Sequence, residues 1–273
     1  MKLSISNIAW NQHEDKEVYN LMNRYGFYGL EIAPTRFFSN PYYQDDKTIN
    51  TLAENIKNHG LTVTSMQSLH FGKDKIKLFG TEEERDELLN YTKDAIEFAS
   101  KLGVNNLVFG SPKLRVINDE QKEYGLAIKF FSELAMYAQE KKVILSIEPN
   151  PKEYGTNFIN TTDEALKLVG MVNNDNFKIN LDLSTIILNN EDIDIIKKCG
   201  KYINHVHISE PFLDILVENR FDFHKNVKEE LEKIGYKNWV SIEMGKKSDI
   251  DNRENIENAL KYISSIFGGE ENK

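Results

Sequence analysis

The sequence is poor in cysteine and in long apolar runs, and both shortages exclude classes of protein. Cys199 is the only cysteine among 273 residues, so no disulfide can form within the chain, which fits a reducing compartment. No apolar run approaches the roughly 18 residues that a membrane span needs. The first residues, MKLSISNIAW, lack the apolar block of a secretory signal. We therefore expect a cytoplasmic protein without a membrane partner.

Basic charge is also scarce, because 34 Lys and Arg residues stand against 43 Asp and Glu residues, a formal net charge of −9. Nucleic acids and anionic membranes attract proteins through basic surfaces, so we expect no nucleic-acid partner. This balance still leaves room for a local basic pocket. The sequence shows neither a nicotinamide-binding fingerprint nor a glycine loop that would cradle phosphates.

The sequence does contain a regular alternation of strand-like and helix-like segments. The expected strands are Leu3–Ala9, Tyr28–Ile32, Leu61–Gln67, Asn106–Phe109, Val143–Glu148, Phe177–Asp182, Ile203–Ser209 and Trp239–Glu243. The expected helices are Asp15–Tyr25, Asp46–Asn58, Thr81–Lys101, Asp119–Lys141, Thr162–Val169, Glu191–Cys199, Asn226–Ile234 and Arg253–Phe267. Such alternation predicts a parallel sheet, and eight units in a chain close to about 250 residues favour a closed barrel. We predict an α/β fold, a (β/α)8 TIM barrel, with residues 1–273 in a single domain.

Acidic or imidazole side chains stand at the carboxyl ends of four predicted strands. They are Glu148, Asp182, His207 and Glu243. The carboxyl ends of all strands of a parallel barrel meet on one face, where active sites lie. Three carboxylates and one imidazole form a mostly oxygen ligand set that suits Mn²⁺, Mg²⁺ or Zn²⁺. The sequence therefore indicates a site for one divalent metal ion.

The strands that carry these residues have one polar and one aliphatic face. Side chains alternate across a strand, which places Ser146, Asn180, His205 and Ser241 on the face of the four ligands. The opposite face carries Leu145, Ile179, Val206 and Ile242. We expect the polar face inside the barrel and the aliphatic face against the helices. Buried polarity of this kind is unfavourable unless it is paired or binds a metal.

Several segments, in this order, resemble a known superfamily. GFYGLEI, IEPNP, LD, HVHISE and GYKNWVSIEM look like the xylose isomerase-like barrels, and they most resemble sugar and sugar-phosphate isomerases and epimerases of the ketose 3-epimerase and hydroxypyruvate isomerase type. The resemblance implies that Glu148, Asp182, His207 and Glu243 hold one divalent ion, with Mn²⁺ favoured over Mg²⁺, Co²⁺ or Zn²⁺. It also implies that Glu148 and Glu243 act as acid and base.

The sequence departs from this family at two places near the predicted site. Many relatives have a histidine three residues after the aspartate, where this chain has Thr185. An arginine often follows the position of Glu210 closely, whereas here Pro211, Phe212 and Leu213 follow and the next arginine is Arg220. Both departures concern residues that bind the sugar.

Isomerisation or epimerisation of a ketose begins with the removal of a proton next to the carbonyl. A divalent ion polarises the carbonyl and stabilises the enediolate, and a carboxylate on each face allows proton removal and return. We therefore predict a divalent-metal-dependent sugar or sugar-phosphate isomerase or epimerase that acts through a metal-stabilised enediolate. The alternatives are an inosose-type dehydratase on the same metal site, an enzyme like the abasic-site endonucleases, and a non-catalytic barrel. The sequence leaves a homo-oligomer open.

Five further residues are predicted to contact the substrate: Glu210, His205, Trp10, Lys113 and Arg115. Lys113 and Arg115 follow the fourth strand with Ser111 and could hold a phosphate or belong to a solvated turn.

Each of the remaining candidates has a structural alternative. Trp10 could form an apolar wall for a sugar ring or pack in the core, and His205 could instead serve only as a structural hydrogen-bonding residue. Glu31 is expected either to bind a sugar hydroxyl or to brace the barrel. His70 could line the pocket, but a position in a surface loop is the favoured expectation.

Overall fold

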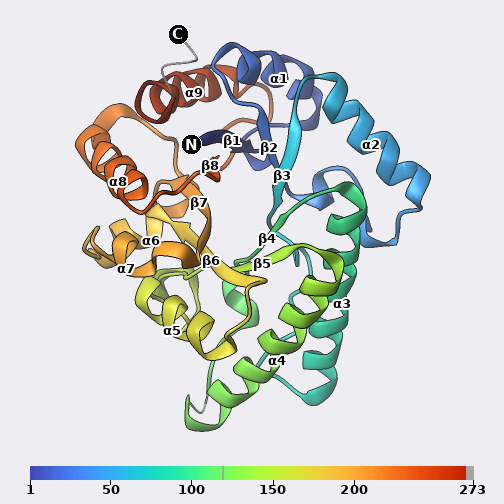
Figure 1. Ribbon diagram of the computed structural model, residues 1–273. Helices are drawn as coiled ribbons and strands as arrows, with labels where there is room; N and C mark the ends of the chain where they lie inside the picture. The colour runs from blue at the N-terminus through green and yellow to red at the C-terminus, as the bar shows by residue number, and fades with distance from the viewer. Residues whose placement is uncertain (119, 269–273) are drawn as a thin grey trace.

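Eight parallel strands form a closed barrel in chain order (Figure 1). The computed structural model describes residues 1–118 and 120–268. The strands are β1 (Lys2–Ser6), β2 (Gly29–Ile32), β3 (Thr62–Met66), β4 (Asn106–Phe109), β5 (Ile144–Ile147), β6 (Phe177–Asp182), β7 (Ile203–Ser209) and β8 (Trp239–Glu243). β1 pairs with β8 and closes the ring. The predicted (β/α)8 barrel is confirmed.

The helices surround the barrel (Figure 1). They are α1 (Asp15–Arg24), α2 (Asp46–Asn58), α3 (Glu82–Leu102), α4 (Glu120–Lys141), α5 (Thr162–Val172), α6 (Leu183–Asn189), α7 (Ile195–Cys199), α8 (Phe221–Lys233) and α9 (Arg253–Phe267). Within the described ranges, no helix has the length and apolar character to cross a bilayer. Asp119, the predicted start of the fourth helix, lies outside the described residues.

The structure differs from the predicted helices mainly between β6 and β8. A short helix, α6, follows β6 directly and was not predicted. The next helix, α7, begins at Ile195 rather than Glu191, because Asn190 has a left-handed backbone (φ 51°) and the Glu191 carboxylate accepts the Thr162 N–H of α5. α8 begins at Phe221, five residues before the predicted Asn226.

The barrel interior is polar, as the alternation along the strands predicts. Ser146 Oγ donates to Asn106 Oδ1 over 2.6 Å, and Asn106 Nδ2 donates to Ser65 Oγ over 2.9 Å, which links β3, β4 and β5 through side chains. His205 faces Glu31 of β2, with 3.2 Å between its Nε2 and Glu31 Oε1. Because the serine and asparagine groups bond to one another and His205 lies beside a carboxylate, the interior tolerates its polarity. The predicted inward face of these strands is confirmed.

Candidate active site

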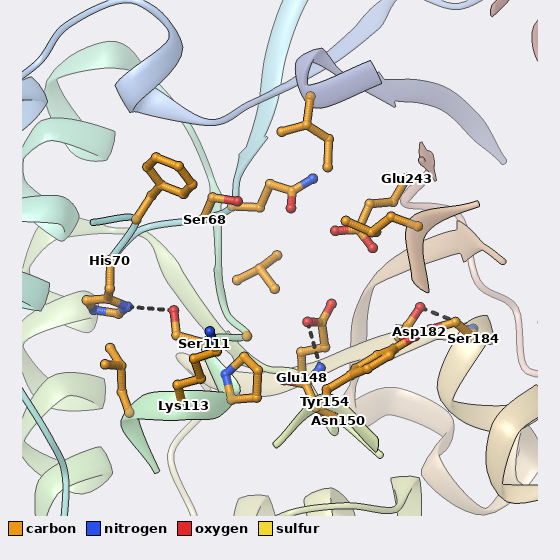
Figure 2. Close-up of a pocket in the computed structure, with 18 of the residues that line it drawn as sticks. Ser68, His70, Ser111, Lys113, Glu148, Asn150, Tyr154, Asp182, Ser184 and Glu243 are labelled. Atoms are coloured by element: carbon orange, nitrogen blue, oxygen red, sulfur yellow. Dashed lines mark hydrogen bonds between the residues drawn. The ribbon is translucent and has the colours of Figure 1, made fainter. Parts of the chain in front are cut away.

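A cavity of about 640 Å³ opens at the carboxyl ends of the strands (Figure 2). Its wall includes residues from the segments that follow β1 and β3 to β7, together with Glu243 at the end of β8. This is the face where active sites of parallel barrels lie. Glu148, Asp182 and Glu243 all line the cavity.

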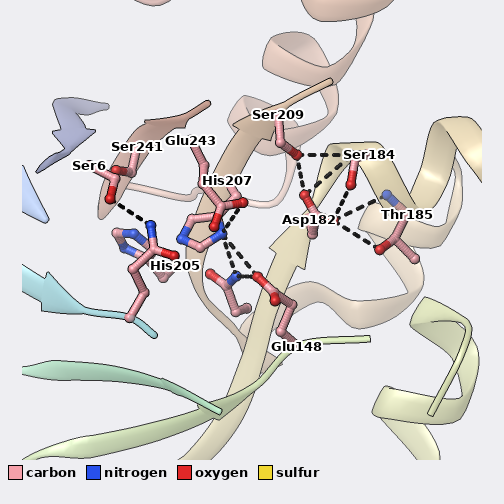
Figure 3. Close-up of polar contacts among 12 residues, drawn as sticks. Ser6, Glu148, Asp182, Ser184, Thr185, His205, His207, Ser209, Ser241 and Glu243 are labelled. Carbon is pink, nitrogen blue, oxygen red and sulfur yellow. Dashed lines mark hydrogen bonds and ion pairs between the residues drawn. The ribbon is translucent and has the colours of Figure 1, made fainter. Parts of the chain in front are cut away.

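Three of the four predicted ligands meet at the cavity floor (Figure 3). His207 Nδ1 lies 2.9 Å from Glu148 Oε1 and 3.2 Å from Glu243 Oε2. One ligand atom from each residue falls within 4.8 Å of the others. Ligand atoms bound at about 2 Å from one ion must lie this close to one another. The three side chains therefore fit a single divalent cation.

Glu31 holds His207 in the orientation that a metal ligand requires. His207 Nε2 lies 3.1 Å from Glu31 Oε2, and Glu31 is fully buried. A histidine that binds a metal through one nitrogen commonly donates the other N–H to a carboxylate, which fixes the ring and its tautomer. With Nε2 directed at Glu31, the other ring nitrogen, Nδ1, faces Glu148 and Glu243. Glu31 therefore braces the barrel, and its burial excludes the alternative contact with a sugar hydroxyl.

Asn180 provides a second observation that fits a cation. Its Nδ2 donates to Glu148 Oε1 over 2.7 Å and lies 3.1 Å from His207 Nδ1. Asn180 Oδ1 is buried and has no hydrogen-bond partner in the part of the chain that the structure describes. Buried acceptors without a partner are uncommon and indicate an absent ion or water. The donor set of this floor is therefore suited to an oxygen-preferring divalent ion.

Asp182 lies in the same cavity wall but caps helix α6 (Figure 3). Its Oδ2 accepts Ser184 Oγ at 2.6 Å and Thr185 Oγ1 at 2.9 Å. Its Oδ1 accepts the Ser184 N–H at 3.2 Å and the hydroxyl of Ser209. Oδ2 also accepts the Thr185 N–H, so both oxygens satisfy the first turn of the helix. Metal binding by Asp182 remains a prediction, and it requires one of these oxygens to be shared.

The two glutamates at the floor have pKa values that are shifted in opposite directions. Burial raises the pKa of Glu243 to about 7, against the lowering effect of His207. Burial also acts to raise the pKa of Glu148, but its hydrogen bonds with His207 and Asn150 outweigh it and lower the pKa. Nearby carboxyl groups with divergent pKa values are typical of acid and base pairs in enzymes. The floor can therefore present one ionised and one partly protonated carboxyl group.

Two of the predicted substrate contacts lie away from the cavity, and these predictions are corrected. Trp10 is 1% exposed, and its Nε1 donates to Asp15 Oδ1 over 2.7 Å; its ring packs edge-on against Tyr19 of α1. His205 is buried against Glu31 inside the barrel. Trp10 is buried because a large aromatic ring packs well in the core. His205 is buried because a carboxylate lies beside its imidazole.

Arg115 and Glu210 are also absent from the cavity wall, because each is held by other residues of the loops. Arg115 is fully buried and donates to the carbonyl oxygens of Phe158 and Glu148. Arg220 Nε donates to both Glu210 oxygens, at 3.0 and 2.8 Å. Arg115 is fully buried, so its predicted contact is corrected to a structural role, whereas a substrate contact of Glu210 stays a prediction.

Lys113 does line the cavity, and so does His70, which was expected in a surface loop. His70 is 4% exposed. Its Nε2 lies 2.9 Å from Thr92 Oγ1 and its Nδ1 lies 3.3 Å from Ser111 Oγ. Burial lowers the pKa of His70 to about 3, so the ring is neutral at physiological pH. The expected surface position is wrong, because the loop after β3 packs His70 against Tyr91 and Thr92 of α3 and Phe109 of β4.

Sequence reasoning missed several polar residues of the cavity wall: Asn150, Tyr154, Ser184 and Ser68. Asn150 Nδ2 donates to Glu148 Oε2 over 3.2 Å. Two of these residues could have been predicted from their place in the sequence, because Asn150 and Ser184 each lie two residues after a predicted ligand.

Exposed aromatic rings flank the cavity mouth from opposite sides. Phe71 follows β3 and is 72% exposed, and Phe212 follows β7 and is 64% exposed. Strands three and seven lie opposite each other in a ring of eight. Phe212 has a left-handed backbone (φ 60°), and its N–H donates to Tyr154 Oη over 2.9 Å. Strain of this kind clusters where proteins hold ligands.

Comparison with solved structures finds barrels of the same fold. D-psicose 3-epimerase from Clostridium cellulolyticum H10 with D-tagatose is 20% identical, with a TM-score of 0.78 over 98% of this chain and 99% of that chain. L-ribulose 3-epimerase is 19% identical, with a TM-score of 0.79 over 98% and 95% of the two chains. The IOLI protein with a bound zinc atom is 21% identical, with a TM-score of 0.75 over 98% of each chain.

Curated proteins give no sequence match, and solved structures at these identities establish the fold alone. The family model of the xylose isomerase-like TIM barrels matches residues 20–266, which include β2 to β8 and all four predicted ligands. The chain therefore belongs to the xylose isomerase-like TIM barrel family.

Proposed function

We propose that this protein is a divalent-metal-dependent isomerase or epimerase of sugars or sugar phosphates. The observation that carries the proposal is the approach of Glu148 and Glu243 to one nitrogen of His207 at the cavity floor. D-psicose 3-epimerase and L-ribulose 3-epimerase, which have the same fold, support it by their activities.

Glu148, His207 and Glu243 would hold the metal ion, and Asp182 is the fourth proposed ligand. We favour Mn²⁺, with Mg²⁺, Co²⁺ and Zn²⁺ as alternatives. The bound ion would supply positive charge next to the substrate carbonyl, which makes the neighbouring C–H bond more acidic. Glu31, behind His207, keeps the imidazole in the ligating tautomer.

Glu148 and Glu243 are the proposed acid and base. Glu148 has a lowered pKa, so it is ionised and ready to accept a proton. Asn150 and Asn180 donate to its two oxygens and fix its direction. Glu243 Oε2 contacts His207, while its Oε1 has no hydrogen-bond partner among the described residues. Because Glu243 lines the cavity, Oε1 is the atom at which we place proton transfer to and from the substrate.

Isotope exchange tests the proposal. The protein is incubated with ketoses and ketose phosphates in D₂O with Mn²⁺, and solvent deuterium is expected at a carbon next to the carbonyl. Glu148→Gln and Glu243→Gln should each lower turnover by about 10²-fold or more at saturating Mn²⁺, since each removes a general acid–base group. Glu153→Gln is the control, because Glu153 is exposed in the loop after β5 and does not line the cavity.

Three outcomes contradict the proposal and favour an alternative. Net loss of water without exchange into a recovered ketose indicates a dehydratase. Cleavage of DNA at abasic sites indicates an endonuclease. Sugar binding without exchange, in protein whose metal content has been measured, indicates a non-catalytic barrel.

A further inference from the structure

Lys113 faces the acidic cavity floor from the opposite side of the barrel. It follows β4, and Glu243 ends β8; these strands lie opposite each other in the closed ring of eight. Figure 2 shows Lys113 and Ser111 on one side of the cavity and Asp182 and Glu243 on the other. Lys113 has no ion-pair partner among the side chains that the structure describes, those of residues 1–118 and 123–268. The loop that carries this ammonium group therefore lies across the cavity from Glu243 and next to Glu148, which follows the neighbouring strand β5.

The chain around Lys113 is basic in an otherwise acidic molecule. The two segments that build this side of the mouth, residues 67–80 and 110–118, contain Lys73, Lys75, Lys77, Lys113 and Arg115. Asp74 is their one acidic residue, so these segments carry a net charge of +4 in a chain of net charge −9. Fields from exposed charges extend over a Debye length of about 8–10 Å at physiological salt. Of these charged side chains, Lys113 and Asp74 line the cavity, and Lys113 is the cation among them.

Ser68 adds an unpaired hydroxyl on the same side. It follows β3, lines the cavity and has a left-handed backbone with φ of 53°. Serine rarely adopts this conformation, and such strain clusters at ligand sites. The Ser68 hydroxyl has no hydrogen-bond partner among the described residues, whereas that of Ser111 contacts His70. His70 is neutral at physiological pH, so the cation in this part of the wall is Lys113.

We propose that Lys113 and Ser68 bind an anionic terminal group of the substrate, a phosphate or a carboxylate, and that the substrate is therefore a phosphorylated or acidic sugar rather than a neutral one. This inference rests on the proposed function, because it places the reacting end of the sugar at Glu148 and Glu243. An ammonium group and a hydroxyl are common partners of phosphate and carboxylate oxygens.

Direct binding tests the anion site without reference to turnover. Inorganic phosphate and gluconate are titrated calorimetrically into the full chain as purified, with equal metal content in each variant. Lys113→Met should weaken binding of the recognised anion by about 10- to 100-fold, since a charge-assisted hydrogen bond is lost. Lys113→Arg should retain most of the affinity. Lys152→Met, which changes an exposed lysine on the same barrel face but outside the cavity wall, should bind like wild type.

The anion that binds shows whether the terminal group of the substrate is a phosphate or a carboxylate. The inference is overturned if Lys113→Met binds each anion as tightly as the wild type does. The kinetic counterpart compares D-fructose with D-fructose 6-phosphate, and D-ribulose with D-ribulose 5-phosphate, by deuterium exchange. If phosphate is the group, wild type should prefer the phosphates in kcat/KM by about 10- to 100-fold, and Lys113→Met should lose that preference through KM.

The two proposals fail in different ways. The anion site is overturned if deuterium exchanges into neutral ketoses at least as fast as into their phosphates and if gluconate binding does not depend on Lys113. That result leaves the isomerase proposal intact. Absence of exchange into every sugar, together with phosphate binding that depends on Lys113, overturns the isomerase proposal and retains the anion site.

Discussion

Replacing Arg115 by methionine removes a fully buried guanidinium that holds the loop carrying Glu148. Its Nη2 donates to the Glu148 carbonyl oxygen and to Asn150 Oδ1, each over 2.7 Å, and its Nη1 donates to the Phe158 carbonyl oxygen over 3.1 Å. Asn150 in turn donates to the Glu148 carboxylate over 3.2 Å. Burial lowers the pKa of Arg115 to about 10, so the group stays charged at pH 7. One side chain therefore fixes both the backbone and, through Asn150, the carboxylate of Glu148.

The expected loss of stability follows from these three hydrogen bonds. Hydrogen bonds from a charged donor contribute about 1.5–3 kcal/mol each, which gives roughly 5–9 kcal/mol for three. Desolvation of a buried ion opposes this by several kcal/mol. We expect Arg115→Met to lower the free energy of unfolding by about 2–5 kcal/mol. Arg115→Lys should be intermediate, because one ammonium group cannot match the fork of donors.

Urea unfolding followed by circular dichroism measures this effect. Arg24→Met is the matched control: Arg24 pairs with Glu257 at 3.1 Å, but its side chain is 63% exposed, so the change should be below about 1 kcal/mol. Turnover of folded Arg115→Met should also fall, because Glu148 loses its support. A loss of stability no larger than that of the Arg24 control would refute the structural role assigned to Arg115.

Three further predictions concern the histidines and the metal. Glu31→Gln should weaken divalent-metal binding by about 10- to 100-fold in a direct metal titration; unchanged affinity would contradict the bracing role. Asp182→Asn and His207→Ala should each lower the metal content of purified protein, and unchanged content in both would remove the site. His70 should make stability pH-dependent, because its unfolded pKa is 6.5 and burial lowers its folded pKa to about 3. The unfolded chain therefore binds a proton between these values, so stability falls as pH drops through the window. Wild type should lose about 2 kcal/mol more than His70→Gln between pH 7.5 and 5, and equal losses in urea unfolding would show that His70 is protonated in the fold.

The sequence by itself determined the strands, most of the helices and the face of each ligand. β7 (Ile203–Ser209) and α9 (Arg253–Phe267) have the predicted bounds, because hydrophobic periodicity is a local property of the chain. The alternation of side chains along β7 was enough to place His205 and His207 on one face. The common direction of parallel strands was enough to bring Glu148, His207 and Glu243 to one end of the barrel.

Only the tertiary structure decided which polar residues face the cavity and which are held behind it. Arg115 and Lys113 lie two residues apart in a loop, where no periodicity fixes the direction of a side chain. Arg115 is buried because three acceptors from residues 148–158 converge on its guanidinium, and Lys113 is left at the cavity because none reaches it. Glu31 became the partner of His207 through closure of the barrel, which brings residues 176 positions apart into contact. Contacts of this kind depend on the register of the whole ring, and no segment of the sequence contains that information alone.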